Sequence, residues 1–428
     1  MFLTALNPKS TFKKIIVIFI TVLLLTVCIE TVNGKNGGKS GMNTQKNDAR
    51  EHLRKIMPTR QQVKDFIDGR AGGELNLSRN KGWTFDADLG WVLSDSVRDR
   101  SVDGSKGFYH YEADGARKVI NFADKPSRIH TYGDSFTHCD QVSDTETWQE
   151  YLAGHLQEPI RNYGVGGYSV YQAYLRMLKV EKENPAEYII LNIYDDDHYR
   201  NLDSLRAIRI GRRTPCGFTL PYLKVNVEKG ICRQVKNIFS KLEDVYQLCD
   251  EEFLYRTFED DPVLQLKLAG KSPGQVDSKA IEALAAGFGV PMKTIETMEK
   301  AEQIRKIHTE AALYATQNIV TWTEQFVRKN NKKLMIILSF DGGNMLNELK
   351  GKVRFDQTFV DWLKDKPYPV IDMRDAFKAD FKNYKLDAGD YVKSYYIGHH
   401  NPKGNFFTAW AIKDKVVEWL DPKPLPYK

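Results

Sequence analysis

The segment 132–138, Tyr-Gly-Asp-Ser-Phe-Thr-His, places a serine directly after the stretch 129–132, Ile-His-Thr-Tyr, which we interpret as a short buried strand. A serine on a strand-to-loop turn presents its hydroxyl as a nucleophile must. Gly133 permits the tight backbone, and Asp134 can hydrogen-bond the turn or begin the next helix. Because Gly-Asp-Ser also occurs in plain turns, the case for Ser135 as a nucleophile depends on other segments.

Two more segments follow predicted strands. The run 162–169, Asn-Tyr-Gly-Val-Gly-Gly-Tyr-Ser, has glycines that let a backbone N–H approach a ligand, so it could donate to an oxyanion or form a structural turn. Its spacing does not match the dinucleotide-binding pattern. The run 192–201 holds three consecutive aspartates. No cluster of histidine or glutamate accompanies them at ligand spacing, so we expect no metal; one aspartate would cap a helix and another would pair with Arg200.

Near the C-terminus, two adjacent histidines stand in the loop 398–405, Gly-His-His-Asn-Pro-Lys-Gly-Asn, ahead of an amphipathic helix expected over 406–420. Core packing explains such a pair poorly. One of them is a candidate for the general base that takes the serine proton.

These segments belong to a pattern of alternating strands and helices, which predicts a parallel sheet covered on both faces. Ligands bind beyond the carboxyl ends of such strands, so the segments should converge in space. The strands are expected at 129–132, 160–163, 188–194, 333–340 and 369–373, and the helices between them at 146–156, 171–179, 313–329 and 359–364.

Taken together, these motifs resemble the sequence blocks of the SGNH, or GDSL-type, hydrolase superfamily. The resemblance covers 129–201 and 333–420. It implies a flavodoxin-like, doubly wound sheet of about five strands and cofactor-free chemistry on acyl esters through an acyl-serine intermediate. It assigns Ser135 as nucleophile, Gly167 as a backbone oxyanion donor and His399 as base, with His400 at a variable position. The expected supporting residues are Asp134, Asp197, His400 and Asn401.

The chain departs from the family pattern at the oxyanion block, where Asp196 stands in place of an asparagine. An ionised carboxylate would repel the developing oxyanion, so Asp196 could serve only if protonated, a state that burial beside Asp195 and Asp197 would favour. Otherwise Asn192 or Asn201 would have to supply the amide.

A second departure concerns the acid that orients the histidine, because Tyr396 occupies its usual position. A backbone carbonyl, Asp387 or Asp390 would then have to fix the tautomer.

The N-terminal residues 1–34 combine lysines with an apolar run over 15–29, which predicts a secretory signal or an uncleaved membrane anchor and hence an exported protein. We expect a linker and surface helix over 35–75, a β-rich extension over 76–121, and the hydrolase-like domain over 122–428. An insertion of mixed character, 202–311, interrupts that domain and is expected to form a lobe over the site.

Export would also favour a disulfide, and Cys216 and Cys232 are the preferred pair because they flank a strand-like stretch. For Cys139 and Cys249, small core residues remain an equally good explanation.

The formal net charge is +6, from 62 Lys and Arg against 56 Asp and Glu, and the two signs are interspersed. This balance argues against a nucleic-acid partner. The sequence therefore predicts an exported esterase acting on small or glycan-borne acyl esters, such as acetyl groups on a polysaccharide, with membrane attachment only through the N-terminal segment. The alternatives are acyl transfer to a glycan hydroxyl and a non-catalytic glycan-binding or envelope protein.

Overall fold

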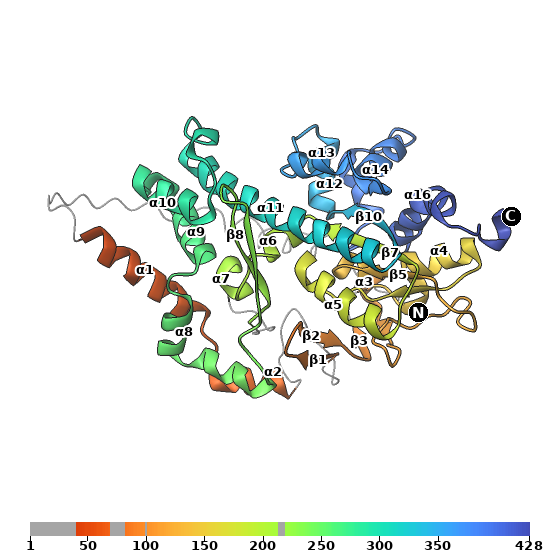
Figure 1. Ribbon diagram of the computed structural model, residues 1–428, viewed down its shortest axis with the longest axis horizontal. Coiled ribbons are helices and arrows are strands. Elements are labelled where there is room, and N and C mark those ends of the chain that lie inside the picture. The colour runs from red at the N-terminus through yellow and green to blue at the C-terminus, as the bar shows by residue number, and fades with distance from the viewer. Residues whose placement is uncertain (1–39, 69–81, 99–100, 213–218) are drawn as a thin grey trace, which may run out of the picture. The chain divides into compact units, whose positions relative to one another are not determined.

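The computed structural model describes residues 40–68, 82–98, 101–212 and 219–428 (Figure 1). The chain divides into two compact units, 1–45 and 46–428, and the larger unit holds the sheet and the predicted site residues. The predicted signal or anchor segment lies outside the described residues. Among those that are described, no helix is long and apolar enough to cross a membrane.

A five-stranded, all-parallel sheet forms the centre of the larger unit. Its spatial order is β11-β10-β7-β5-β6, so the strands, numbered along the chain, follow the order 2-1-3-4-5. This arrangement confirms the predicted α/β class and is compatible with a flavodoxin-like fold. The strands are β5 (Ile129–Tyr132), β6 (Ile160–Asn162), β7 (Tyr188–Tyr194), β10 (Lys333–Ser339) and β11 (Val370–Asp372).

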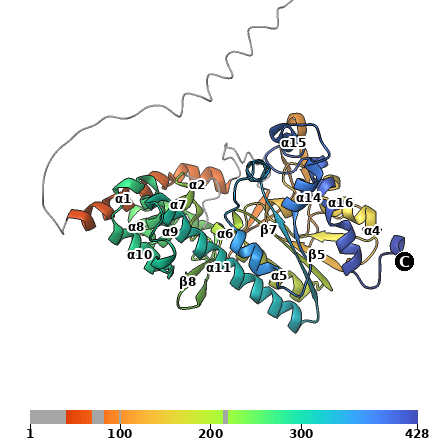
Figure 2. The same ribbon diagram turned by 90° about the horizontal axis from the view of Figure 1, so that it is seen from above.

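Each face of the sheet is buried against helices, as the mostly apolar central strands β7 and β10 require. In β7, Ile189, Leu191 and Ile193 belong to one hydrophobic core and Ile190 to the other. Helices α5 (Val170–Glu183) and α11 (Lys300–Lys329) contribute to the first core; α4 (Trp148–Leu156), α14 (Met373–Phe381) and α16 (Pro402–Trp419) contribute to the second (Figure 2).

Short helices complete the sheet-bearing part. They are α3 (Ser135–His138), α6 (Asp197–Arg200), α12 (Gly342–Leu349), α13 (Gln357–Leu363) and α15 (Ala388–Lys393).

The stretch expected to be β-rich contains two small antiparallel sheets. Strands β1 (Trp83–Asp86) and β2 (Gly90–Leu93) form one, and β3 (Ser96–Arg98) and β4 (Gly107–Tyr109) form the other. Of its aromatic residues, Trp83, Trp91 and Tyr109 are buried, so these three serve packing rather than an open sugar site.

The insertion expected between β7 and β10 does not end at residue 311, where the sequence pattern placed its boundary. Residue 311 was predicted to separate the insertion from the helix 313–329, but α11 is one continuous helix that begins at Lys300. Its buried positions recur at helical spacing on both sides of residue 311, so nothing interrupts it. Before it come α7 (Arg206–Ile210), β8 (Tyr222–Asn226), β9 (Ile231–Val235), α8 (Glu251–Phe258), α9 (Pro262–Lys271) and α10 (Ser278–Phe288).

The surface helix expected near the N-terminus is two helices, α1 (Ser40–Ile56) and α2 (Arg60–Ile67). Pro58 interrupts them, and Thr59 starts the second with a capping box. Cys139, Cys232 and Cys249 are free thiols. The predicted partner of Cys232, Cys216, lies outside the described residues.

Candidate active site

The predicted site residues gather at the carboxyl ends of β5, β6 and β7, where the strand order reverses. Gly133 makes the first turn possible because a Cβ at this position would collide with the Thr137 side chain and lie 2.5 Å from the Asn192 carbonyl oxygen. Only glycine fits there without a shift of backbone. The chain can therefore leave β5 sharply and begin α3 at Ser135.

The structure brings Ser135 and His399 together although 264 positions separate them. The distance from Ser135 Oγ to His399 Nε2 is 2.8 Å, a hydrogen-bonding distance. Asp134 caps α3 by accepting from the Phe136 N–H at 2.9 Å, and its other oxygen lies 3.1 Å from Ser135 Oγ. The predicted nucleophile and base are thus in contact, and the aspartate of the motif fixes the turn that carries the nucleophile.

Gln141 orients the histidine. Its Oε1 accepts from the backbone N–H of His399 at 2.8 Å and lies 3.0 Å from His399 Nδ1. A backbone N–H can only donate, so the side-chain atom that meets it must be the carbonyl oxygen. That oxygen cannot donate in turn, so Nδ1 must carry the hydrogen in the neutral ring. Nε2 is then free to accept the proton of Ser135.

The same amide of Gln141 also has a donor role, because Nε2 donates to the Ile397 carbonyl at 3.0 Å. Gly398 allows this close contact between the two loops. A Cβ on Gly398, whose φ is +118°, would lie 2.7 Å from Gln141 Oε1. Glycine is therefore required immediately before His399.

The prediction that Asp387 or Asp390 orients His399 is wrong. Asp387 caps α15 by accepting from the N–H groups of Gly389 and Asp390, and Asp390 pairs with Lys393 on the surface. Nothing in the local sequence singled out Gln141, since it is an ordinary polar residue 258 positions from His399.

A buried arginine from the β-rich extension holds the loop that carries Gln141. Arg117, 2 % exposed, donates through Nη1 to the carbonyls of His138 and Cys139 and through Nη2 to that of Val142. Its Nε donates to Asp144 at 2.9 Å.

This loop needs such support. Cys139 and Gln141 have positive φ values of 64° and 75°, which are unfavourable for residues other than glycine. The Tyr109 hydroxyl accepts from the Gln141 backbone N–H at 2.6 Å. The extension therefore shapes the loop that positions the base.

The second histidine, His400, is a core residue. It is 4 % exposed and packs edge-on to Phe136 and beside Tyr396 and Phe377. Burial, with a further effect of His399, lowers the pKa of His400 to about 3, so its ring is neutral near pH 7.

Asn401 shapes the same loop. Its Oδ1 caps α16 by accepting from the Gly404 N–H at 2.9 Å, and its Nδ2 donates to the Ser394 carbonyl at 3.0 Å.

The three aspartates after β7 are paired with arginines. Asp195 receives two bonds from Arg374, at 2.7 and 2.8 Å. Asp197 accepts from Arg200 Nη1 at 2.7 Å, and the same nitrogen lies 3.3 Å from Asp134. The predicted pairing of an aspartate with Arg200 is confirmed.

Asp196 could donate to an oxyanion only if its carboxyl group were protonated, and this condition is not met. Its carboxylate binds Arg200 and, through both oxygens, Arg209 of α7. Burial works toward a higher value, but these arginines bring the pKa of Asp196 far below its ordinary range. The side chain therefore has no proton to donate to an oxyanion.

Backbone donors remain available. Within the described residues, the backbone N–H groups of Ser135 and Gly167 make no hydrogen bond. Gly167, at φ +82°, directs its carbonyl to Arg206 Nη1 at 2.5 Å. Asn201 is occupied, because its amide binds the Tyr171 N–H and the Thr316 hydroxyl. Asn192 lies inside β7 and is 3 % exposed.

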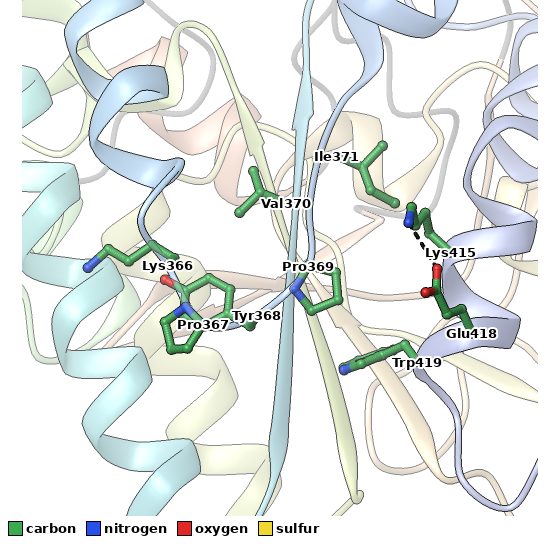
Figure 3. A pocket seen from close by; sticks show the side chains of 9 residues that line it. All are labelled: Lys366, Pro367, Tyr368, Pro369, Val370, Ile371, Lys415, Glu418 and Trp419. Carbon is green, nitrogen blue, oxygen red and sulfur yellow. Dashed lines mark hydrogen bonds and ion pairs between the residues drawn. The ribbon is translucent and has the colours of Figure 1, made fainter.

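A groove of about 480 Å³ lies elsewhere, between the start of β11 and the end of α16 (Figure 3). Its lining includes Lys366, Tyr368 and Trp419. Lys366 and Tyr368 precede β11, whereas Ser135 follows β5. Because all strands of the sheet are parallel, the groove and the serine lie toward opposite ends of the strands. Over the described part of the chain, no group of three or more His, Cys, Asp or Glu residues could hold a metal ion.

No family model matches this chain, and no curated protein matches it either. Its residues and their geometry therefore have to carry any conclusion about function.

Proposed function

We propose that this protein is an exported serine hydrolase of the SGNH type, with a flavodoxin-like sheet, that cleaves acyl esters through an acyl-serine intermediate. The observation that carries the proposal is the 2.8 Å contact between Ser135 Oγ and His399 Nε2, with His399 Nδ1 bound to Gln141. A nucleophile, a base and a group that orients the base are the requirements for activating a serine.

In the proposed reaction, His399 Nε2 takes the hydroxyl proton as Ser135 Oγ attacks the ester carbonyl. The backbone N–H groups of Ser135 and Gly167 would donate to the tetrahedral oxyanion, since no other acceptor in the described residues uses them. His399 then returns the proton to the departing alcohol. Water, activated by the same ring, attacks the acyl-serine and releases the acid.

The proposed substrates are acyl esters, small or carried by a glycan, and acetyl groups on a polysaccharide would suit an exported enzyme. No cofactor or nucleic acid takes part, and the N-terminal segment would account for any membrane attachment. The substrate class depends on the predicted export and on the family resemblance. Transfer of the acyl group to a glycan hydroxyl would use the same residues, with the sugar taking the place of water.

Labelling with a fluorophosphonate probe tests the nucleophile. The parent and Ser135→Ala are compared with His399→Ala and with a control, Ser105→Ala, whose serine is exposed on the extension. We expect the parent and the control to label, Ser135→Ala not to label, and His399→Ala to react at least about 1000-fold more slowly. Equal labelling of the parent and Ser135→Ala would refute the assignment.

A chromogenic acetyl ester, with and without an oligosaccharide acceptor, tests the reaction. We expect acetate release that depends on Ser135 and is unchanged by the acceptor. An acetylated oligosaccharide appearing at the expense of free acetate would identify the protein as a transferase instead.

A further inference from the structure

The backbone N–H of Gly167 is one of the donors available to the oxyanion, and its direction depends on the peptide group that follows it. The carbonyl of that peptide, on Gly167, accepts from Arg206 Nη1 at 2.5 Å. Its N–H, on Tyr168, donates to the Val165 carbonyl at 3.1 Å. Because a peptide group is planar, these two bonds fix its plane. Only the φ and ψ rotations of Gly167, whose φ is +82°, separate the Gly167 N–H from that plane.

A second arginine binds the next carbonyl of the same loop. Arg200 Nη1 donates to the Tyr168 carbonyl at 3.0 Å. The same nitrogen lies 3.3 Å from Asp134 Oδ2, and that oxygen lies 3.1 Å from Ser135 Oγ. The two arginine-bound carbonyls therefore lie beside the turn that carries the nucleophile.

Asp196 connects the two arginines. Its carboxylate accepts from Arg200 Nε at 2.8 Å and from Arg209 at 2.8 and 3.1 Å. Arg209 also donates through Nε to Asp203 at 3.0 Å. Asp203 accepts in addition from Arg206 Nε at 3.3 Å. One carboxylate is thus linked, through two lines of hydrogen bonds, to two consecutive carbonyls of the loop.

Fold stability alone explains Arg206 poorly. Burial, followed by the charge of Arg200, lowers the pKa of Arg206 to about 10, so its surroundings disfavour the charge that it still carries near pH 7. Its Nη2 is enclosed and makes no hydrogen bond within the described residues, which destabilises a fold. Asp203 is already bound by Arg209. In the part of the chain that the structure describes, the Gly167 carbonyl is the acceptor that Arg206 alone serves.

We propose that Arg200 and Arg206 form a clamp on the Tyr168 and Gly167 carbonyls that aims the Gly167 N–H at the oxyanion, and that Asp196 anchors this clamp. All three charged residues are positioning residues, because they act through the backbone of the loop. The insertion, through α7, and the aspartate that departs from the SGNH pattern thereby serve one purpose. This inference deepens the proposed function and rests on it.

The test compares Arg206→Gln, Arg206→Met and a control, Arg256→Gln, which changes an exposed arginine of α8 in the same insertion. The Nε2 of a glutamine stands where the arginine has Nε, so Arg206→Gln can keep the bond to Asp203. Its side chain ends too early to reach the Gly167 carbonyl. Arg206→Met removes both bonds and is the second variant if the first does not fold.

Two readouts separate an effect on the loop from an effect on the fold. The first is amide hydrogen exchange of peptides covering 164–169, measured by mass spectrometry, which needs no activity. The second is kcat/KM on the acetyl ester divided by kcat/KM on its thionoacetyl counterpart, in which sulfur replaces the carbonyl oxygen. Sulfur accepts hydrogen bonds weakly, so the thiono ester gains less from the oxyanion donors. This ratio does not depend on how much of the protein is folded.

For both Arg206 variants we expect kcat/KM on the acetyl ester to fall about 100-fold and the ratio of the two esters to fall at least about 10-fold, because a donor to the oxyanion is misdirected. Exchange over 164–169 should become faster, whereas exchange over β5 and β7 should match the parent. Arg256→Gln should match the parent in both readouts.

Parental exchange over 164–169 in folded Arg206 variants would overturn the clamp, whatever happens to the rates. Faster exchange with an unchanged ratio of the two esters would overturn the connection between the clamp and the oxyanion. Faster exchange in variants of a parent that hydrolyses neither ester would leave the clamp on the loop standing and refute the hydrolase function. The failure of this inference and the failure of the proposed function are therefore distinguishable.

Discussion

Replacing Arg117 with methionine should damage the site from a distance. The guanidinium is fully enclosed and binds three carbonyls of the loop 138–142 as well as Asp144. Methionine fills similar volume but leaves the Asp144 side chain, 7 % exposed, without its buried arginine. Breaking a buried ion pair in this way costs about 3–5 kcal/mol, so we expect the free energy of unfolding to fall by that amount and Tm by several degrees.

Catalysis should suffer even in the molecules that remain folded. Arg117 holds Cys139 and Gln141 at positive φ, a strain of about 1–3 kcal/mol per residue. Without it, the loop can relax and carry the Gln141 amide away from His399. A displacement of the Gln141 amide by about 1 Å costs about 100-fold in rate. The rate of fluorophosphonate labelling per folded molecule should therefore fall by about that factor.

The assay pairs chemical denaturation with labelling at a temperature where circular dichroism shows the variant to be folded. Arg161→Met is the control, because it removes an arginine that is 30 % exposed and paired with Asp114. Such a pair contributes about 0–1 kcal/mol, and its loss should leave labelling unchanged. An Arg117→Met protein with parental stability and parental labelling would refute this account of the extension.

Three other changes test neighbouring features. The pKa of His400 is about 3 in the folded protein and near 6.5 in the unfolded chain, so the free energy of unfolding is highest above pH 6.5 and falls as the pH drops toward 3. At pH 4.5 this loss is about 3 kcal/mol. His400→Leu should avoid the loss when denaturation is measured as a function of pH. Gly398→Ala should slow labelling about 100-fold because the new methyl group displaces Gln141, and labelling at the parental rate would contradict this. Asp196→Asn introduces the asparagine found at this place in the SGNH pattern that the sequence resembles. It should lower stability by about 1–3 kcal/mol through lost bonds to Arg209 and bring no gain in acetyl-ester hydrolysis. A faster variant would show that this side chain reaches the oxyanion.

Much of the sheet could be predicted because its signal is local. The bounds of β5 and β7 agree with the strands predicted at 129–132 and 188–194, and the other three strands differ from prediction by only a residue or so at either end. Turn glycines and capping residues mark where these runs end. Ser135 and His399 could be found for the same reason, since each stands in a short loop beside a predictable element.

The supporting residues could not be predicted, because their roles are set by distant partners. Asp196 resembles an oxyanion residue in sequence, but Arg209, 13 positions later, neutralises it. Gln141 becomes the orienting group only where the loop before α16 meets the loop after α3. The break at Pro58 is different, because proline is a local helix-breaking signal that the prediction of a single surface helix overlooked.

The contacts of Arg117 also bear on how this protein can be divided. A fragment starting at residue 122, the boundary suggested by the sequence pattern, would keep every strand of the parallel sheet and both reacting side chains. It would lack the arginine that binds the 138–142 backbone and the Tyr109 hydroxyl that meets Gln141. Truncated expression clones, and comparisons restricted to the sheet, would therefore omit part of the structure that holds the Gln141 loop against His399.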